Sequence, residues 1–242
     1  MRTLKRGLKG EDVRQLQAAL NKAITAGLAE DGIFGAKTQA AVRNYQRQNK
    51  LTVDGIAGRQ TLGALGLIDN SPFEIKCEDL KQYSAPHGSM IYGPNSSYST
   101  YGKGGCGVTS FAVCYRAYGL APVGETSTET IQRIGKYAWQ HGYRPKGGGT
   151  NLALFGTNGL HYASIKASQV EDTIRAGFLV VFRIKKGFPN GYTGDGHYIV
   201  GYGIKDGNVL LRDVGFSAAS RQKAPLSKIG TGLKGAYKIY TK

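Results

Sequence analysis

Apolar residues recur at helical spacing within the first seventy residues of this 242-residue chain. Two amphipathic stretches, at 13–20 and 42–46, place apolar side chains three or four positions apart. Their defining residues are Val13, Leu16, Gln17 and Leu20 in the first stretch and Val42, Tyr45 and Gln46 in the second. Ala64 and Leu65 begin a third apolar group. Because glycines separate these stretches, the pattern predicts three short helices joined by glycine turns.

An internal repeat accompanies these helices. Residues 31–38 read DGIFGAKT, and residues 54–61, at an offset of 23 positions, read DGIAGRQT. In each copy an Asp-Gly turn leads through a second glycine into a helix. We interpret the Asp-Gly pairs and the second glycines as builders of turns and not as contacts to a ligand.

The pattern changes after residue 67. A polar stretch breaks the helical spacing and predicts a linker at 68–73, between one domain at 1–67 and a second at 74–242. In the second domain, helical spacing predicts helices at 106–118 and about 129–140. Strand-like runs predict an antiparallel sheet with strands at 178–184, 197–204 and 208–214. The expected fold class is α+β, with a small all-α domain followed by an α+β domain.

Cys106 lies where a glycine-rich run ends and the helix at 106–118 begins. The unpaired N–H groups and the positive dipole end of a helix N-terminus stabilise a thiolate and lower the pKa of a thiol. The flanking glycines are expected to leave room for a substrate carbonyl group. Most cysteines are packing residues, and we interpret Cys77 and Cys114 in that way. Cys106 is the candidate nucleophile.

Two partners for this thiol lie on a predicted β-hairpin. With a three-residue loop at 205–207, Asp213 would lie opposite Ile199 and share the face of His197. A two-residue loop would instead place Asp213 opposite Val200, on the other face. Diagonal neighbours on one face can join a carboxylate to an imidazole. We therefore predict the longer loop and a contact between His197 and Asp213.

Cys106, His197 and Asp213 have the order and setting of a thiol catalyst for acyl transfer. In this hypothesis Cys106 attacks a carbonyl carbon, His197 accepts the thiol proton and returns it to the leaving amine, and Asp213 orients the imidazole. Each residue also has a structural alternative, since a strand histidine is usually a surface or satisfied core residue and an aspartate before Gly215 can start a turn. Among the other histidines, His161 is the strongest rival base.

These residues carry a family resemblance. The run YGKGGCGVTSFA at 101–112, with His197 in GHYIVGY and Asp213 closing the next strand, resembles the C39-like branch of papain-like cysteine peptidases. That family usually shows Gly-Cys-Gly-Pro-Thr-Ser and Asp-Pro, and here Val108 and Val214 replace the prolines. The resemblance implies a papain-like domain in which the three residues have the roles given above.

The same resemblance implies a donor for the oxyanion, commonly a glutamine upstream of the nucleophile. The nearest glutamine is Gln82, 24 positions before Cys106. Gln82 could serve only if the intervening segment loops out and returns. The alternative is the Cys106 N–H together with an unidentified donor.

The first domain carries a second resemblance. Residues 8–17, LKGEDVRQLQ, and both Asp-Gly repeats resemble the three-helix type of peptidoglycan-binding domain. The resemblance implies that bacterial peptidoglycan is the partner of this domain. It assigns no ligand-contacting residue.

The chain is strongly basic, with a formal net charge of +16. Residues 1–70 hold 11 Lys and Arg against 6 Asp and Glu, and the remainder holds 21 against 10. This charge suits anionic wall polymers, whereas scattered basic residues without a reader motif argue against nucleic acid. No zinc-ligand spacing occurs, and the glycine run at 102–107 lacks the βαβ context of a dinucleotide loop, so neither metal nor cofactor is expected. No apolar run is long enough to cross a membrane, and a monomer is expected.

The start of the sequence has no apolar signal region. We therefore expect a product made in the cytoplasm that acts at the bacterial cell wall after release, as bacteriophage endolysins do. The expected function is a peptidoglycan hydrolase that cleaves an amide of the wall peptide, with an endopeptidase favoured. The alternatives are an N-acetylmuramoyl-L-alanine amidase on the same fold, a papain-like acyltransferase and a non-catalytic wall-binding protein.

Overall fold

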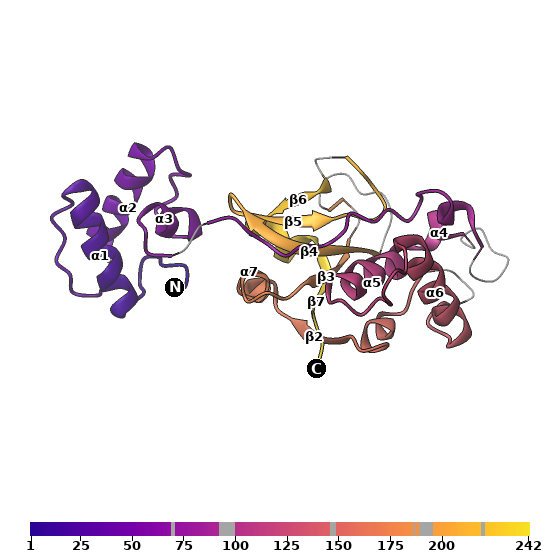
Figure 1. Ribbon diagram of the computed structural model, residues 1–242. Coiled ribbons are helices and arrows are strands. Elements are labelled where there is room, and N and C mark those ends of the chain that lie inside the picture. Colours follow the sequence, from indigo (N-terminus) through magenta and orange to yellow (C-terminus); the bar gives the residue numbers. More distant parts are fainter. Residues whose placement is uncertain (69–70, 92–99, 146–148, 186, 189–195, 219–220) are drawn as a thin grey trace. The chain divides into compact units, whose positions relative to one another are not determined.

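Figure 1 shows the computed structural model, which describes residues 1–68, 71–91, 100–145, 149–185, 187–188, 196–218 and 221–242. The chain divides into two compact units, Met1–Ser71 and Pro72–Lys242. The division falls inside the predicted linker at 68–73, of which Asp69 and Asn70 lie outside the described residues.

The first unit contains the three expected helices. They are α1 (Glu11–Ile24), α2 (Ala36–Gln48) and α3 (Arg59–Ala64). Their apolar faces meet in one core whose largest members are Leu4, Leu16, Leu20, Phe34, Tyr45 and Leu62. The prediction of a small all-α domain is confirmed.

The Asp-Gly repeats build the same hydrogen-bonded turn twice. In the first copy, Nε2 of the buried Gln17 donates to Oδ1 of Asp31 (2.8 Å) and to Oγ1 of Thr38 (3.3 Å). Its Oε1 accepts from the N–H of Gly32 (2.9 Å), a residue with a φ of +73° that favours glycine. One glutamine from α1 therefore holds the turn that leads into α2.

The second copy repeats this arrangement from α2. Gln46 donates to Asp54 (2.9 Å) and Thr61 (3.1 Å) and accepts from the N–H of Gly55 (2.9 Å), which also has a φ of +73°. The repeated Asp and Gly thus build turns, as the sequence predicted, and the repeated Thr adds a hydrogen bond to each turn. The glutamines that hold them are 29 positions apart, so the repeat of 23 does not include them.

Replacing Gln17 by methionine is expected to destabilise the first unit by about 2–3 kcal/mol. The change keeps the length of the side chain but leaves the buried Gly32 N–H without an acceptor, which costs about 1–3 kcal/mol, and removes the bonds to Asp31 and Thr38. Urea unfolding of the full chain, followed by hydrogen exchange in α1 and α2, measures the effect. Gln15→Met, two positions away on the exposed face of α1, is the control and should change stability little. Equal losses in both variants would contradict the prediction.

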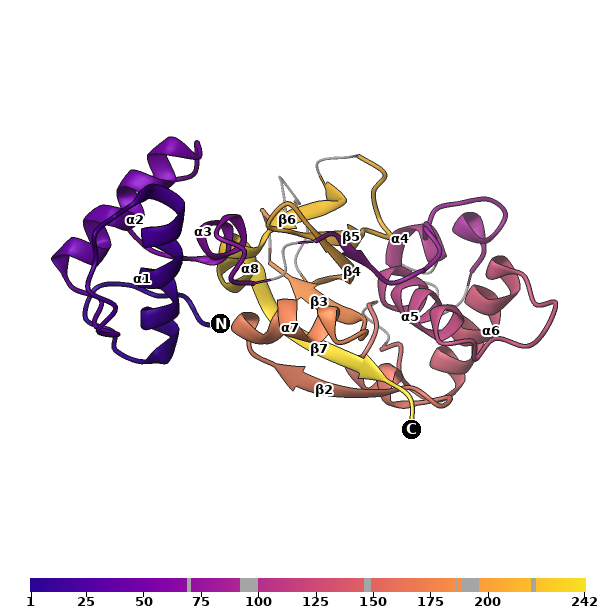
Figure 2. The same ribbon diagram turned by 60° about the vertical axis from the view of Figure 1, so that its left-hand side comes forward.

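The second unit is built on one antiparallel sheet. Its described strands follow the order β2-β7-β3-β4-β5-β6, with β1 also pairing to β4 (Figure 2). The strands are β1 (Phe73–Glu74), β2 (His161–Ile165), β3 (Val180–Ile184), β4 (His197–Lys205), β5 (Asn208–Arg212), β6 (Lys223–Pro225) and β7 (Leu233–Tyr240). β4 lies centrally and is buried along nearly its whole length.

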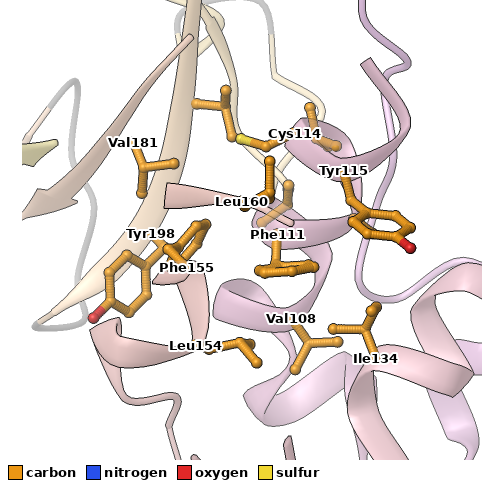
Figure 3. Close-up of a cluster of buried hydrophobic side chains, with 14 of the residues drawn as sticks. Val108, Phe111, Cys114, Tyr115, Ile134, Leu154, Phe155, Leu160, Val181 and Tyr198 are labelled. Atoms are coloured by element: carbon orange, nitrogen blue, oxygen red, sulfur yellow. The ribbon is translucent and has the colours of Figure 1, made fainter. Parts of the chain in front are cut away.

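Helices cover both faces of the sheet. The described α-helices of this unit are α4 (Tyr101–Gly104), α5 (Cys106–Ala117), α6 (Ser127–Gln140), α7 (Val170–Arg175) and α8 (Leu226–Gly232). On one face, Phe111 of α5 packs in a cluster with Val181 and Tyr198 (Figure 3). On the other, Ile174 of α7 packs with Phe182, whose side chain alternates with that of Val181 along β3. The predicted α+β class is confirmed.

Several predicted element ends shift by one or two residues. α6 begins at Ser127 and not at 129, because Thr126 is its N-cap and Glu129 completes a capping box. β3 begins at Val180 instead of 178, and β5 ends at Arg212 instead of 214. α5 ends at Ala117, one residue early, and Gly119 follows in a left-handed conformation with a φ of +69°.

Candidate active site

Cys106 is the first residue of α5, as the sequence predicts, and its side chain is partly buried. At this position its N–H has no acceptor in a preceding turn of α5. The residues before it form the short helix α4, so the two helices meet at Gly105. Cys106 therefore lies at the junction of α4 and α5.

The glycines around Cys106 do not leave open space for a substrate, so that expectation is wrong. A Cβ on Gly105 would overlap the carbonyl oxygen of Tyr101, and one on Gly107 would overlap the side chain of Thr150. The space that a side chain at either glycine would occupy is filled by neighbouring atoms of the protein. These glycines allow close packing of α4 and of residue 150 against the start of α5.

The three-residue hairpin loop predicted at 205–207 is also wrong. Lys205 pairs with Asn208, which leaves Asp206 and Gly207 as a two-residue turn. Both residues have positive φ, 50° and 71°, as a type I′ turn requires. This register alone would place Asp213 opposite Val200, on the face away from His197.

A β-bulge in β4 returns Asp213 to the face of the sheet that His197 occupies, as predicted. Gly203 pairs with Leu210, but Gly201 pairs with Leu211, so Tyr202 is an extra residue on β4. Beyond the bulge Val200 pairs with Arg212, and the next position in that register sets Asp213 opposite Ile199. The predicted alignment is reached through the bulge and not through the loop.

His197 and Asp213 are in direct contact. Nε2 of His197 donates to Oδ1 of Asp213 over 2.7 Å, and the same oxygen accepts from the N–H of Gly215 over 3.0 Å. The His197 side chain is 4% exposed and Asp213 is fully buried. The edge of the Phe216 ring faces the imidazole, with 6.1 Å between ring centroids. The carboxylate therefore fixes the orientation of the ring in a buried setting.

The His197 side chain lies next to the thiol of Cys106, near enough for the two groups to shift each other's pKa. Because Nε2 is engaged by Asp213, Nδ1 is the ring nitrogen that remains for an interaction with the thiol. The structure thus brings together all three residues selected from the sequence, in the order thiol, imidazole, carboxylate.

Opposing effects set the pKa values of the thiol and the imidazole. Burial acts to raise the pKa of Cys106, but the hydrogen bond and charge of His197 and the N–H groups of Tyr198 and Gly107 outweigh it and lower the pKa. Burial acts to lower the pKa of His197, but its hydrogen bonds to Asp213 and Cys106 raise the pKa to about 9. The pair therefore favours a thiolate beside an imidazolium.

A pH profile tests this arrangement. Because the pKa of His197 is raised, its charged form stabilises the folded site at low pH, and this contribution is lost as the pH rises through about 9. We expect kcat/KM on soluble muropeptides to fall above about pH 9, where His197 loses its proton. Asp213→Asn removes a carboxylate that raises this pKa, so the alkaline limb should move to lower pH. An alkaline limb at the same pH in Asp213→Asn would contradict the assignment.

Gln82 lies close to this group of residues. Its main-chain N–H donates to the carbonyl of Val214 (2.8 Å), and its Nε2 donates to the carbonyl of Gly102 (2.7 Å), four positions before Cys106. The residues just before Cys106 therefore return to Gln82, as a role of Gln82 as oxyanion donor requires. The neighbouring Lys81 donates from Nζ to the carbonyl of Asp213 (2.9 Å).

The rival residues lie elsewhere. His161 is on the edge strand β2, separated from β4 by β7 and β3, and its ring stacks on Tyr240 with centroids 5.6 Å apart. Cys114, on α5, is buried in the core, and Cys77 packs against the same core (Figure 3 shows Cys114). All three cysteines are free thiols. The packing interpretation of Cys77 and Cys114 is confirmed.

A cleft with a volume of about 430 Å³ opens beside the thiol. Its described lining includes Cys106, Thr150, Leu152, Arg183 and Tyr198. Arg183 was not among the residues predicted for the site, because a lone arginine on a strand carries no local signature.

Arg144 was also missed, because a lone arginine in a loop carries no local signature. It is 2% exposed, and its Nη1 donates to the carbonyls of Gly104 and Gly149, at 3.2 Å each. Gly149 lines the cleft and Gly104 ends α4. Arg144 therefore ties the cleft wall to the residues that precede Cys106.

Within the residues that the structure describes, no three His, Cys, Asp or Glu side chains are grouped as metal ligands. None of the described helices combines the length and apolar character that crossing a membrane requires.

Comparison with known families agrees with the two-unit division. A model of the Peptidase_C39 like family matches residues 81–242, more than half of the chain. The chain belongs to this family. A peptidoglycan binding domain model matches residues 9–65. The C39-like unit thus contains Cys106, His197 and Asp213, and a peptidoglycan-binding domain precedes it.

Individual relatives match shorter segments. The amidase CwlM of Mycobacterium tuberculosis is 40% identical over 85 residues, which are 33% of this chain and 21% of CwlM. A spore cortex-lytic enzyme of Bacillus cereus is 45% identical over 60 residues, or 24% of this chain and 22% of that enzyme. The chain spans only about a fifth of the length of these curated relatives. A crystal structure of a C39-like peptidase from Bacillus anthracis aligns with 57% of this chain and 89% of its own, at 14% identity and a TM-score of 0.36.

Proposed function

We propose that this protein is a peptidoglycan hydrolase that cleaves an amide bond of the cell-wall peptide with Cys106 as the nucleophile. The observation that carries the proposal is the hydrogen bond between the His197 imidazole and the buried Asp213 carboxylate, with the thiol of Cys106 beside the imidazole at a cleft. A thiolate next to an imidazolium is the starting state for acyl transfer to sulfur. The names of the similar proteins, an amidase and a spore cortex-lytic enzyme, are consistent with a wall substrate.

In the first half-reaction, the Cys106 thiolate attacks the amide carbonyl carbon and the carbonyl electron pair moves to oxygen. The N–H of Cys106 and the second hydrogen of Gln82 Nε2 are the proposed donors to this oxyanion. When the tetrahedral intermediate collapses, the C–N bond breaks and His197 gives its Nδ1 proton to the leaving amine. The products of this step are a free amine and a thioester on Cys106.

In the second half-reaction, His197 accepts a proton from water, and the resulting hydroxide attacks the thioester. Collapse of this intermediate breaks the C–S bond, releases a carboxylic acid and restores the thiolate. Asp213 holds the ring orientation in both steps and stabilises the imidazolium. The sum is hydrolysis of one amide, with no further reactant than water.

The peptidoglycan-binding domain is proposed to keep this site near its substrate. Anchoring one unit on a polymer raises the effective concentration of that polymer for the other unit. The positive charge of both parts of the chain also favours association with anionic wall polymers.

Mass spectrometry of muropeptides after digestion of purified walls tests the proposal. The wild type should create new amine termini, and Cys106→Ala should not. An amine on an amino acid within the stem or cross-bridge would identify an endopeptidase, which we favour. An amine on the alanine next to the lactyl group would identify an amidase. Ligated products without new termini would identify an acyltransferase and overturn the proposal.

A further inference from the structure

Arg183 is a charged side chain in the cleft beside Cys106, and no Asp or Glu is found among the described lining residues. It lies on β3 between Phe182 and Ile184, which pack on the α7 side of the sheet. Because side chains alternate along a strand, Arg183 projects on the same side as Val181, toward α5 and the cleft. Its register partner on β4 is Tyr198, the residue after His197.

The guanidinium of Arg183 lies at the surface of the cleft. The residue is exposed, and within the described part of the chain it forms neither a hydrogen bond nor an ion pair. A Cβ on Gly196 would lie 3.6 Å from Arg183 Nε, so the group lies over the residue that precedes His197. Five N–H donors in a planar fork thus lie within the cleft that contains the candidate nucleophile.

The surroundings of this guanidinium favour an anion. The buried Arg144 lies behind the cleft wall and binds the carbonyl of Gly149, which adds a second positive charge close to the cleft. Burial raises the pKa of Tyr198 to about 12 despite the charge of Arg183, so its phenol stays protonated near neutral pH. A planar carboxylate matches the fork of an arginine, whereas a neutral amide lacks the charge.

We propose that Arg183 is a specificity-determining residue that binds a free carboxylate of the peptide substrate next to the scissile amide. The inference rests on the proposed function and deepens it, because it names the substrate class as peptides with an ionised carboxylate at this position. Amidated forms of the same peptides are then the poorer substrates.

The test compares one substrate pool in two chemical forms. Muropeptides released from walls by a glycosidase are used as isolated, and also after their carboxylates have been coupled to ammonia with a carbodiimide. We expect the full-length wild type to have a kcat/KM at least about 10-fold higher on the carboxylate form, which is the usual size of a charge-assisted contact at a partly exposed site. Arg183→Gln should lose about 10-fold on this form and should not change on the amidated form.

Two further variants sharpen the comparison. Arg183→Lys keeps the charge without the fork, so it should retain part of the preference. Lys205→Gln, at the exposed β4–β5 turn, removes one positive charge away from the cleft and should keep the full preference. The rate on the amidated pool reports folding of each variant, because it does not depend on the carboxylate contact.

Two results would overturn the inference: no preference in the wild type, or an equal loss on both substrate forms in Arg183→Gln. Failure of the proposed function would look different. In that case Cys106→Ala would hydrolyse the pool as the wild type does. If Cys106→Ala is inactive and Arg183→Gln keeps the preference, only the carboxylate inference fails.

Discussion

Cys106→Ala is expected to lower the rate of amide hydrolysis by about 10⁴-fold or more while wall binding is unchanged. Removal of the nucleophile of a catalytic unit deletes the covalent route and leaves only what substrate binding and oxyanion donors supply. Alanine is a good helix former, so the start of α5 should be retained. Product formation is measured by mass spectrometry of wall digests, and binding by co-sedimentation with purified walls.

Cys77→Ala is the matched control for this prediction. Cys77 is also a free, partly buried thiol, but it packs against the core and has no contact with His197 among the described interactions. The Cys77→Ala variant should hydrolyse amides at a rate near that of the wild type. Retained hydrolysis in Cys106→Ala, or an equal loss in Cys77→Ala, would be incompatible with Cys106 as the nucleophile.

His197→Gln is the second change with a large expected effect, a loss of about 10³-fold or more in kcat/KM. Glutamine can still donate to the buried Asp213, whereas alanine would leave that carboxylate without its partner at a cost of about 3–5 kcal/mol. The variant should therefore fold but lack a group that accepts and returns the proton. Hydrolysis rates and the thermal unfolding midpoint measured on the same samples separate the two effects.

The reactivity of the thiol gives an independent readout of the same change. The charge and hydrogen bond of His197 lower the pKa of Cys106, so the pH at which iodoacetamide labelling rises should move upward in His197→Gln. His161→Gln, at the far edge of the sheet, should alter neither labelling nor hydrolysis. A loss of activity in His161→Gln, with none in His197→Gln, would show that the base lies on β2 and that the assignment of His197 is wrong.

The bulge at Tyr202 shows where local sequence patterns fail. Turn chemistry at Asp206 and Gly207 permits either loop length, and the shorter one is observed. The glycines at 201 and 203 were a usable signal, since glycine inside a strand often marks a bulge. Each is also required by a distant neighbour, because a Cβ would crowd the Phe182 ring at 201 and the Phe73 carbonyl at 203.

The sequence by itself determined the three helices of the first unit, the position of Cys106 at the start of α5 and the candidate series of Cys106, His197 and Asp213. These features depend on spacing over a few residues or on a motif. Only the tertiary structure decided the bulge that aligns Asp213, the return of the chain to Gln82, and the placing of Arg144 and Arg183 around one cleft. Those contacts join residues 20 to 132 positions apart or depend on strand register, and such distant packing leaves no periodic trace in the chain.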